Sequence, residues 1–259
     1  MTPVLMFWLL PATLDFLTYG GEAWTDPTPR AVVQEWWMDG HWVQVSAGKG
    51  PWRIRLEGFD FGEFDYRTAT PTPDPLTTYR PYAVNATAGR VIPLDVDMDL
   101  LLMPGVFSFR FLDQVWQGWT LDAAVQYRPV LPPRLRVIGK LRITAGLAHL
   151  GFPVSLRGRS VRLPITSWAR VEMARRRWRY GLFYRNVHGD ARTEEWAVQV
   201  AYRHPQVLLE TEFWGNRPLD PFRFRVGLPY QNLELLYRYT WDRTGRDMHG
   251  IEVRWHGRS

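Results

Sequence analysis

Apolar and polar side chains alternate with a period of two residues along much of the C-terminal part of the chain. Between Asn232 and Trp241 the odd-numbered positions are apolar or aromatic, and most of the even-numbered positions are polar. The same alternation runs through Glu195–Arg203, Phe222–Leu228 and Gly250–His256. Because successive side chains of a β-strand point to opposite faces, this pattern predicts strands with one greasy face and one mostly charged face.

A further stretch, Leu94–Leu102, alternates in the same way and is predicted to be one strand. Asp95, Asp97 and Asp99 share one of its faces at spacings of roughly 7 Å. One extended strand cannot bring carboxylates so far apart to a single calcium ion, so this cluster predicts a charged face rather than a metal site.

The links between the predicted strands also alternate in length. Short links such as His204–Pro205 and Pro229–Tyr230 alternate with longer ones at 188–194, 216–221 and 242–248. A meander with short turns at one end and longer loops at the other is typical of membrane β-barrels. We therefore expect an all-β fold, an antiparallel meander closed as a transmembrane β-barrel of roughly 10–14 strands.

The N-terminal quarter has shorter segments and predicts a division of the chain into parts. Residues 1–12 resemble the apolar part of a secretory signal, and residues 13–67 form a β-rich segment that includes a hairpin signal at Asp39–Gly40. Residues 68–81 are rich in Pro and Thr, which is typical of a loop or linker. Residues 82–259 are then the predicted barrel.

Composition supports strands and excludes several kinds of chemistry. The chain of 259 residues contains 14 Trp, 21 Gly and 20 Pro, which disfavours both a disordered chain and a helical bundle. It has no cysteine, so a disulfide framework and a thiol nucleophile are excluded. The formal net charge of +6 is compatible with nucleic acid, with lipid headgroups or with an arginine-lined interior.

If the greasy faces of the strands point to lipid, the opposite faces line a lumen that carries charges of both signs. Arginine pairs well with carboxylates, so an internal network that holds the barrel together is one interpretation, and an ion- or solute-selective path is the other. Because these arginines have acidic partners within the chain, no binding of nucleic acid is expected. The predicted lumen residues are Asp95, Asp97, Asp99, Arg179, Arg185, Glu210, Glu212, Arg223, Arg225, Glu234, Arg238, Glu252 and Arg254.

The greasy faces supply the predicted lipid-facing and girdle residues. Trp and Tyr gather at membrane interfaces, and six tryptophans lie near predicted strand ends: Trp168, Trp178, Trp196, Trp214, Trp241 and Trp255. The full predicted lipid-facing or girdle set is Trp196, Val198, Val200, Tyr202, Leu233, Leu235, Tyr237, Tyr239, Trp241 and Trp255.

No pattern in the chain indicates catalysis. The histidines lack metal-ligand spacing, and neither a serine-nucleophile motif nor a phosphate loop is present. Glu210 and Glu212 are neighbours on one predicted strand, whereas glycosidase carboxylates converge across a cleft. The basic segment Val171–Trp178 could form a helical turn suited to phosphate contact, but the short length favours a turn between two strands at Arg175–Arg177. We therefore expect a protein that is not an enzyme and needs no cofactor or metal.

At the level of fold class, residues 80–259 resemble bacterial outer-membrane barrels. Within that class, the short segments Leu17–Pro27, Trp42–Gly58 and Phe59–Tyr66 are similar to the stacked strands of the organic-solvent-tolerance or lipopolysaccharide-assembly family. That resemblance implies a place in the bacterial outer membrane, membrane lipid and the barrel-assembly machinery as partners, and export of lipid.

The function predicted from the sequence is passage, export or assembly of a polar or amphipathic envelope solute. Two alternatives stay open. One is a structural barrel whose lumen is plugged by charges. The other is a secreted soluble β-sandwich that binds carbohydrate through its aromatic side chains.

Overall fold

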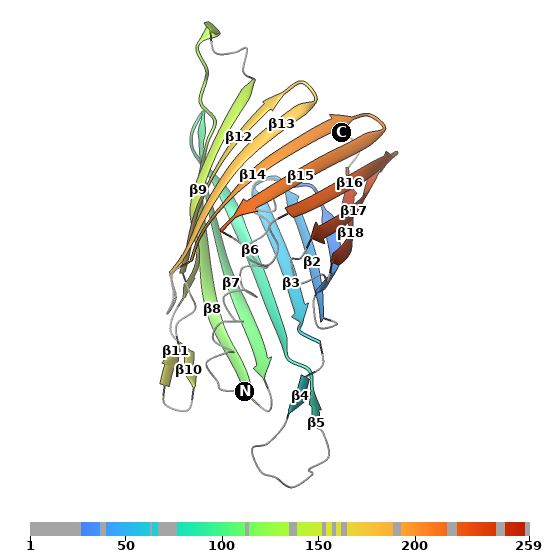
Figure 1. Ribbon diagram of the computed structural model, residues 1–259. Helices are drawn as coiled ribbons and strands as arrows, with labels where there is room; N and C mark the ends of the chain where they lie inside the picture. Colours follow the sequence, from blue (N-terminus) through green and yellow to red (C-terminus); the bar gives the residue numbers. More distant parts are fainter. Residues whose placement is uncertain are drawn as a thin grey trace.

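Fourteen antiparallel strands hydrogen-bond side to side in a closed ring in the computed structural model (Figure 1). The predicted all-β meander barrel is therefore confirmed, and the alternative of two packed sheets in a soluble sandwich is wrong. The segment 1–12, predicted as a signal remnant, lies outside the described residues. The structure describes residues 27–36, 40–62, 64–66, 77–111, 114–134, 139–151, 154–156, 159–161, 165–188, 193–216, 222–241 and 247–256.

The strands follow the ring in sequence order, except that two small hairpins, β4–β5 and β10–β11, are inserted between neighbouring wall strands. Figure 1 shows both small hairpins at the same end of the barrel. The strands are β1 (Arg30–Trp36), β2 (Gly40–Lys49), β3 (Trp52–Asp60), β4 (Phe64–Tyr66), β5 (Thr77–Tyr79), β6 (Tyr82–Asp95), β7 (Met98–Phe111), β8 (Gln114–Tyr127), β9 (Lys140–Gly151), β10 (Val154–Leu156), β11 (Arg159–Val161), β12 (Ile165–Arg175), β13 (Trp178–His188), β14 (Thr193–His204), β15 (Val207–Gly215), β16 (Phe222–Tyr230), β17 (Leu233–Trp241) and β18 (Met248–Trp255).

The two ends of the barrel differ in most of their connections, with two exceptions to the predicted pattern. The link 128–139 joins β8 to β9 at the end that carries most of the short turns, and the link from β7 to β8 at the other end has only two residues, 112–113. Two-residue turns gather at one end, which we call the tight-turn end: Gly50–Pro51, Val96–Asp97, Arg176–Arg177, Pro205–Gln206 and Gln231–Asn232. The opposite end, which we call the loop end, carries both small hairpins and the longer links at 188–194, 216–221 and 242–248. The basic segment before Trp178 is the turn that was expected there.

The wall is not equally deep all round. Strands β6, β7 and β8 have 14 residues each. Strands β15, β16 and β17 have 9 residues each, and β1 has 7. The side of the ring built from β6 to β8 therefore extends farther along its strands than the side built from β15 to β1.

Side chains on one face of each wall strand are buried and those on the other are exposed. Arg55 on β3 reaches Asp122 on β8 although β6 and β7 lie between these two strands, and both side chains are buried. Such a contact is possible only across the interior of the ring. The buried face therefore lines the lumen, and the exposed face is the outer surface of the barrel.

The lumen also contains apolar clusters that the sequence pattern did not predict. Trp42, Phe59, Phe61 and Phe109 belong to one cluster, in which the rings of Phe59 and Phe61 lie 4.5 Å apart, edge to face. A second cluster includes Met103 and Trp168. Part of the interior is consequently a packed hydrophobic core.

The predicted division of the chain at residues 68–81 is wrong as a domain boundary. The N-terminal segment 13–67 contains β1, β2 and β3, and all three are wall strands. β1 pairs with β2 on one side and with β18 on the other, and β3 pairs with β6. Without these strands β6 and β18 would be free edges, so the barrel requires them.

The stretch Leu94–Leu102 is a hairpin rather than one strand. β6 ends at Asp95, the turn is Val96–Asp97, and β7 begins at Met98. The register shifts between Pro93 and Asp95, as in a β-bulge. The extra residue keeps odd-numbered side chains on the same face before and after the turn, so the alternation continues through it.

A single proteolytic cut tests the corrected topology. An engineered protease site at residues 70–74 lies between β4 and β5, and cutting there severs only the covalent link between β3 and β6. Because the strands on both sides remain hydrogen-bonded within the ring, residues 27–60 should stay with the rest of the chain in unheated gel electrophoresis and size-exclusion chromatography. Release of the N-terminal fragment in detergent without denaturation would contradict the observed strand order.

Candidate functional site

The best-formed polar arrangement in the described lumen surrounds Glu210, Glu252 and the arginines between them. Glu210 accepts hydrogen bonds from Arg225 and from the amide of Gln199. Glu252 accepts from Nε of Arg254 at 2.7 Å, and Arg238 lies 3.7 Å from the same carboxylate. Arg225 lies between the two carboxylates, with Nη1 3.8 Å from Oε2 of Glu252. Four strands, β15 to β18, are thereby connected through side chains as well as backbone.

A second charged cluster occupies the lumen between β2, β3 and β8. Arg55 lies 3.4 Å from Glu57 and 3.1 Å from Asp122, and all three side chains are almost completely buried. The amide of Gln44 donates to Glu57 at 2.8 Å, and the backbone N–H of His149 donates to Asp122 at 2.8 Å. Buried ions are tolerated when they are paired and hydrogen-bonded, and this cluster meets that requirement.

Arginine side chains inside the lumen lie over the faces of aromatic rings. The guanidinium groups of Arg185 and Arg223 each lie 5.6 Å from the ring centre of Trp214, and Arg238 lies 5.4 Å from Trp42. The prediction that Trp168 and Trp214 belong to an interfacial girdle is therefore wrong. Both rings are buried inside the barrel, at 5% and 3% exposure, where they pack against apolar and cationic neighbours.

Three ion pairs in the lumen at the tight-turn end share the same orientation with respect to water. Arg128 pairs with Asp99 at 2.6 Å, Arg142 with Glu172 at 3.6 Å, and Arg203 with Glu234 at 3.3 Å. In each pair the arginine is the exposed partner: the exposed fractions are 46% against 14%, 43% against 9%, and 55% against 0%. At these three pairs the water therefore meets guanidinium groups, with the carboxylates behind them, whereas the β6–β7 turn at the same end carries the exposed Asp95.

The structure brings some of the predicted lumen residues together and separates others. Glu210, Arg225, Glu234, Arg238, Glu252 and Arg254 form the connected group on β15 to β18. Glu212 lies 3.9 Å from Arg223, Arg185 pairs with Glu195, and Arg179 lies on β13 beside Ala201.

The aspartates of the predicted cluster behave differently from one another. Asp95 accepts a hydrogen bond from the backbone N–H of Val96 and is exposed at the turn, where Asp97 also lies. Only Asp99 reaches the lumen charges, through Arg128 and the amide of Gln126. The bulged hairpin, rather than a straight strand, separates these three side chains.

Several members of the charge clusters were missed by sequence reasoning. Arg55 and Glu57 alternate with Ile54 and Leu56 in the same way as the recognised strands, but their segment was assigned to a separate N-terminal part. On β8, Asp122 likewise lies between two neighbours that face outward. The period-two signal was present at these positions and could have identified them.

The outer surface of the wall is apolar and exposed. Of the residues predicted to face lipid, Trp196, Val198, Leu233, Leu235, Tyr237, Trp241 and Trp255 are exposed on this surface, and Val200, Tyr202 and Tyr239 are partly covered. Exposed aromatic rings occur near both ends, for example Trp52, Trp178 and Trp255 at the tight-turn end and Trp196 and Trp241 at the loop end.

Within the described residues, no helix has the length and hydropathy needed to cross a bilayer. Within the same residues, no group of three or more His, Asp or Glu side chains is placed to hold a metal ion.

Comparison with known proteins finds likeness in shape but not in sequence. No family model and no curated protein matches the chain. Among solved structures, it is similar to the KdgM porin (TM-score 0.47, 8% identity, 88% of this chain and 98% of that chain). It is also similar to Omp33 of Acinetobacter baumannii (0.46, 8%, 88% and 96%) and to OpdK of Pseudomonas aeruginosa (0.41, 11%, 88% and 96%). At these values the likeness carries no function, and nothing in the comparisons supports the lipopolysaccharide-assembly family.

The buried cluster around Asp122 predicts a sharp difference between two aspartate substitutions. Asp122→Ala leaves Arg55 with one carboxylate partner fewer in a buried site, so we expect the free energy of unfolding to fall by about 3–5 kcal/mol. Asp97→Ala, the matched control in the turn, should change it by less than about 0.5 kcal/mol. Urea unfolding followed by tryptophan fluorescence in detergent micelles measures both. Equal effects would show that the buried pair contributes no more than a solvated turn.

Proposed function

We propose that the chain spans the bacterial outer membrane as a β-barrel and lets small polar solutes, anions in preference to cations, pass through its lumen. The observation that carries the passage function is the polarity of the tight-turn mouth, where guanidinium groups face the water and their carboxylates lie behind them. A solute that passes these three pairs meets positive charge first.

The membrane position rests on the inversion of the usual burial pattern. Soluble proteins bury their apolar side chains, whereas this barrel exposes valine, leucine and isoleucine around its outer surface and buries charges inside. A closed barrel also satisfies every wall strand's backbone hydrogen bonds without water, which a bilayer requires. Aromatic rings near both ends match the girdles of outer-membrane barrels.

The same class of proteins supplies the proposed orientation and partners. Outer-membrane barrels have short turns on the periplasmic side and longer loops outside, which assigns the tight-turn end of this chain to the periplasm. Membrane lipid and the barrel-assembly machinery are the proposed partners of such a wall, and export of a lipid remains the narrower form of the proposal.

A second candidate function is that of a structural barrel whose lumen is closed by its own charges. It is favoured by the carboxylates of Glu57, Glu234 and Asp122, which are fully buried. Asp122 and Glu234 are paired with arginines of other strands, and Glu57 is paired with Arg55 on its own strand. Charges held in this way resist displacement by a passing ion. The two candidates make opposite predictions for ion conductance.

The membrane position predicts that an arginine on the outer surface disrupts assembly. Val198 is exposed in the middle of β14, and its replacement by Arg should cost about 2–4 kcal/mol in a bilayer if it lies near the midplane. Leu235→Arg on β17 should act in the same direction. Gln206→Arg, in a turn at the tight-turn end, is the control and should assemble normally. Folding yield into liposomes, read by heat-modifiable gel mobility, distinguishes them, and normal yields for both wall variants would refute the membrane position.

Passage of anions is tested by single-channel recording in planar bilayers under a salt gradient. The wild-type barrel should conduct ions, and its reversal potential should have the sign of an anion-selective channel. The double variant Arg142→Gln with Arg203→Gln should lower the anion-to-cation permeability ratio by roughly twofold or more. Arg90→Gln, which removes a charge from the outer surface, should leave the ratio unchanged. A correctly inserted barrel without conductance would instead support the charge-plugged structure.

A further inference from the structure

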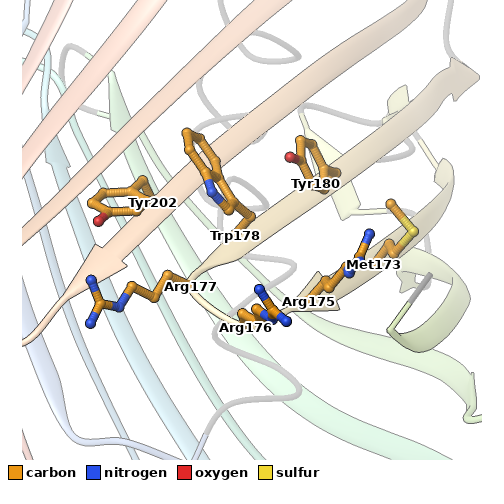
Figure 2. Close-up of a pocket in the computed structure, with 7 residues that line it drawn as sticks. All are labelled: Met173, Arg175, Arg176, Arg177, Trp178, Tyr180 and Tyr202. Carbon is orange, nitrogen blue, oxygen red and sulfur yellow. The ribbon is translucent and has the colours of Figure 1, made fainter. Parts of the chain in front are cut away.

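The outer surface carries a groove at the tight-turn end, around the turn that joins β12 to β13. It encloses about 670 Å³ and is lined by Met173, Arg175, Arg176, Arg177, Trp178, Tyr180 and Tyr202. Figure 2 shows the rings of Trp178, Tyr180 and Tyr202 in a row, with the three arginines beside them at the turn. The groove thus combines an aromatic wall with a cationic rim.

Strand register explains why these side chains meet. Arg175 is paired with Trp178, Met173 with Tyr180, and Trp178 in turn with Tyr202 on β14. Paired residues project from the same face of a sheet, and this face is the outer one. The ring centres of Trp178 and Tyr202 lie 4.8 Å apart, and those of Trp178 and Tyr180 lie 6.2 Å apart.

The arginines of the rim differ from those of the lumen in their surroundings. Arg175, Arg176 and Arg177 are all exposed, and no described residue forms an ion pair with any of their side chains. The other two-residue turns at this end contain no lysine or arginine. The three positive charges are therefore concentrated at one place on the rim of the barrel and lack acidic neighbours among the described residues.

The backbone of this turn holds Arg176 in an unfavourable conformation. Its φ angle is 53°, in the left-handed region that favours glycine. A glycine at this first turn position would relieve that conformation, since turns with one such φ value at this place prefer glycine. Gln231, the first residue of the β16–β17 turn, has a φ angle of 52°, so this conformation belongs to the two-residue turns of this end rather than to the groove.

We propose that this groove binds the phosphate headgroup of an anionic phospholipid, such as phosphatidylglycerol, in the leaflet next to the tight-turn end. Arginine guanidinium groups bind phosphate oxygens through paired N–H donors, and Trp and Tyr lie at headgroup depth in membranes. The inference rests on the proposed membrane position of the barrel, but not on passage through its lumen.

The apolar wall next to the groove favours a lipid over a free anion. From Tyr180 and Met173 the outer surface continues along the same strands through Leu182 and Val171, both exposed, toward the middle of the wall. Acyl chains attached to a headgroup in the groove would lie against this aliphatic surface. Inorganic phosphate could use the arginines alone.

Native mass spectrometry of the detergent-solubilised barrel, titrated with phosphatidylglycerol, tests the proposal. The variant Arg175→Gln, Arg176→Gly and Arg177→Gln removes the three charges and places glycine at the strained position, so the turn should still form. We expect its affinity for the lipid to fall on the order of a hundredfold, since each arginine near a membrane surface contributes to headgroup attraction. The control variant Lys49→Gln, Arg90→Gln and Arg134→Gln removes three exposed charges elsewhere at the same end and should bind like the wild type.

Four further measurements make the outcome decisive. Diacylglycerol with the same acyl chains should not be retained, and inorganic phosphate should not displace the phospholipid at equal concentration. Equal loss of lipid in the control variant would overturn the proposal in favour of a diffuse basic rim, and displacement by inorganic phosphate would overturn the lipid as occupant. Heat-modifiable gel mobility of all variants verifies folding, and failed liposome insertion of the wild type would count against the membrane position instead.

Discussion

Closure of the ring is the constraint on which the rest of this structure depends. A sheet has two edges whose backbone N–H and C=O groups lack partners, and only a strand that pairs on both sides removes them. β1 does this for the whole wall, with β2 on one side and β18 on the other. Once the ring is closed, each wall strand has one face inside and one outside, and both candidate sites follow from that separation.

Closure also determines what the charged residues can do. Side chains that project inward from strands far apart in the ring are brought within reach of one another, as Arg55 and Asp122 are across β6 and β7. Such pairs are removed from water, so salt screens them much less than pairs on the surface. The outer surface has the opposite composition, and the cationic group Arg175–Arg177 lies at the end of the wall, beside aromatic rings.

Sequence alternation predicted the barrel class and many wall strands, but it failed where register and turn geometry decide the outcome. In β16 the inward residues have odd numbers, as Arg223 has, and after the two-residue turn the inward residues of β17 have even numbers, as Glu234 has. This change from odd to even makes the turn visible in the sequence pattern. In the β6–β7 hairpin a bulge adds one residue, so the inward residues have odd numbers in both strands and the turn was hidden. Trp168 and Trp214 were assigned to the girdle because they lie near predicted strand ends, whereas the face is determined by whether a residue falls on an inward or an outward position of the alternation. The contacts between distant strands depend on the stagger of the closed ring, which no local pattern contains.

If the barrel spans a membrane, as proposed, the unequal depth of its wall has a consequence for the bilayer around it. A strand of 14 residues is about 46 Å long and one of 9 residues about 30 Å, at the usual rise per residue. A flat bilayer of uniform thickness cannot match both sides of such a ring at once. Either the longer strands β6 to β8 extend beyond the bilayer into water, or the lipid beside β15 to β18 thins, or the barrel axis leans away from the bilayer normal. Each of the last two adjustments costs a fraction of a kcal/mol per ångström of mismatch. The asymmetry would give the barrel a preferred inclination, and with it a thinner strip of bilayer along one flank.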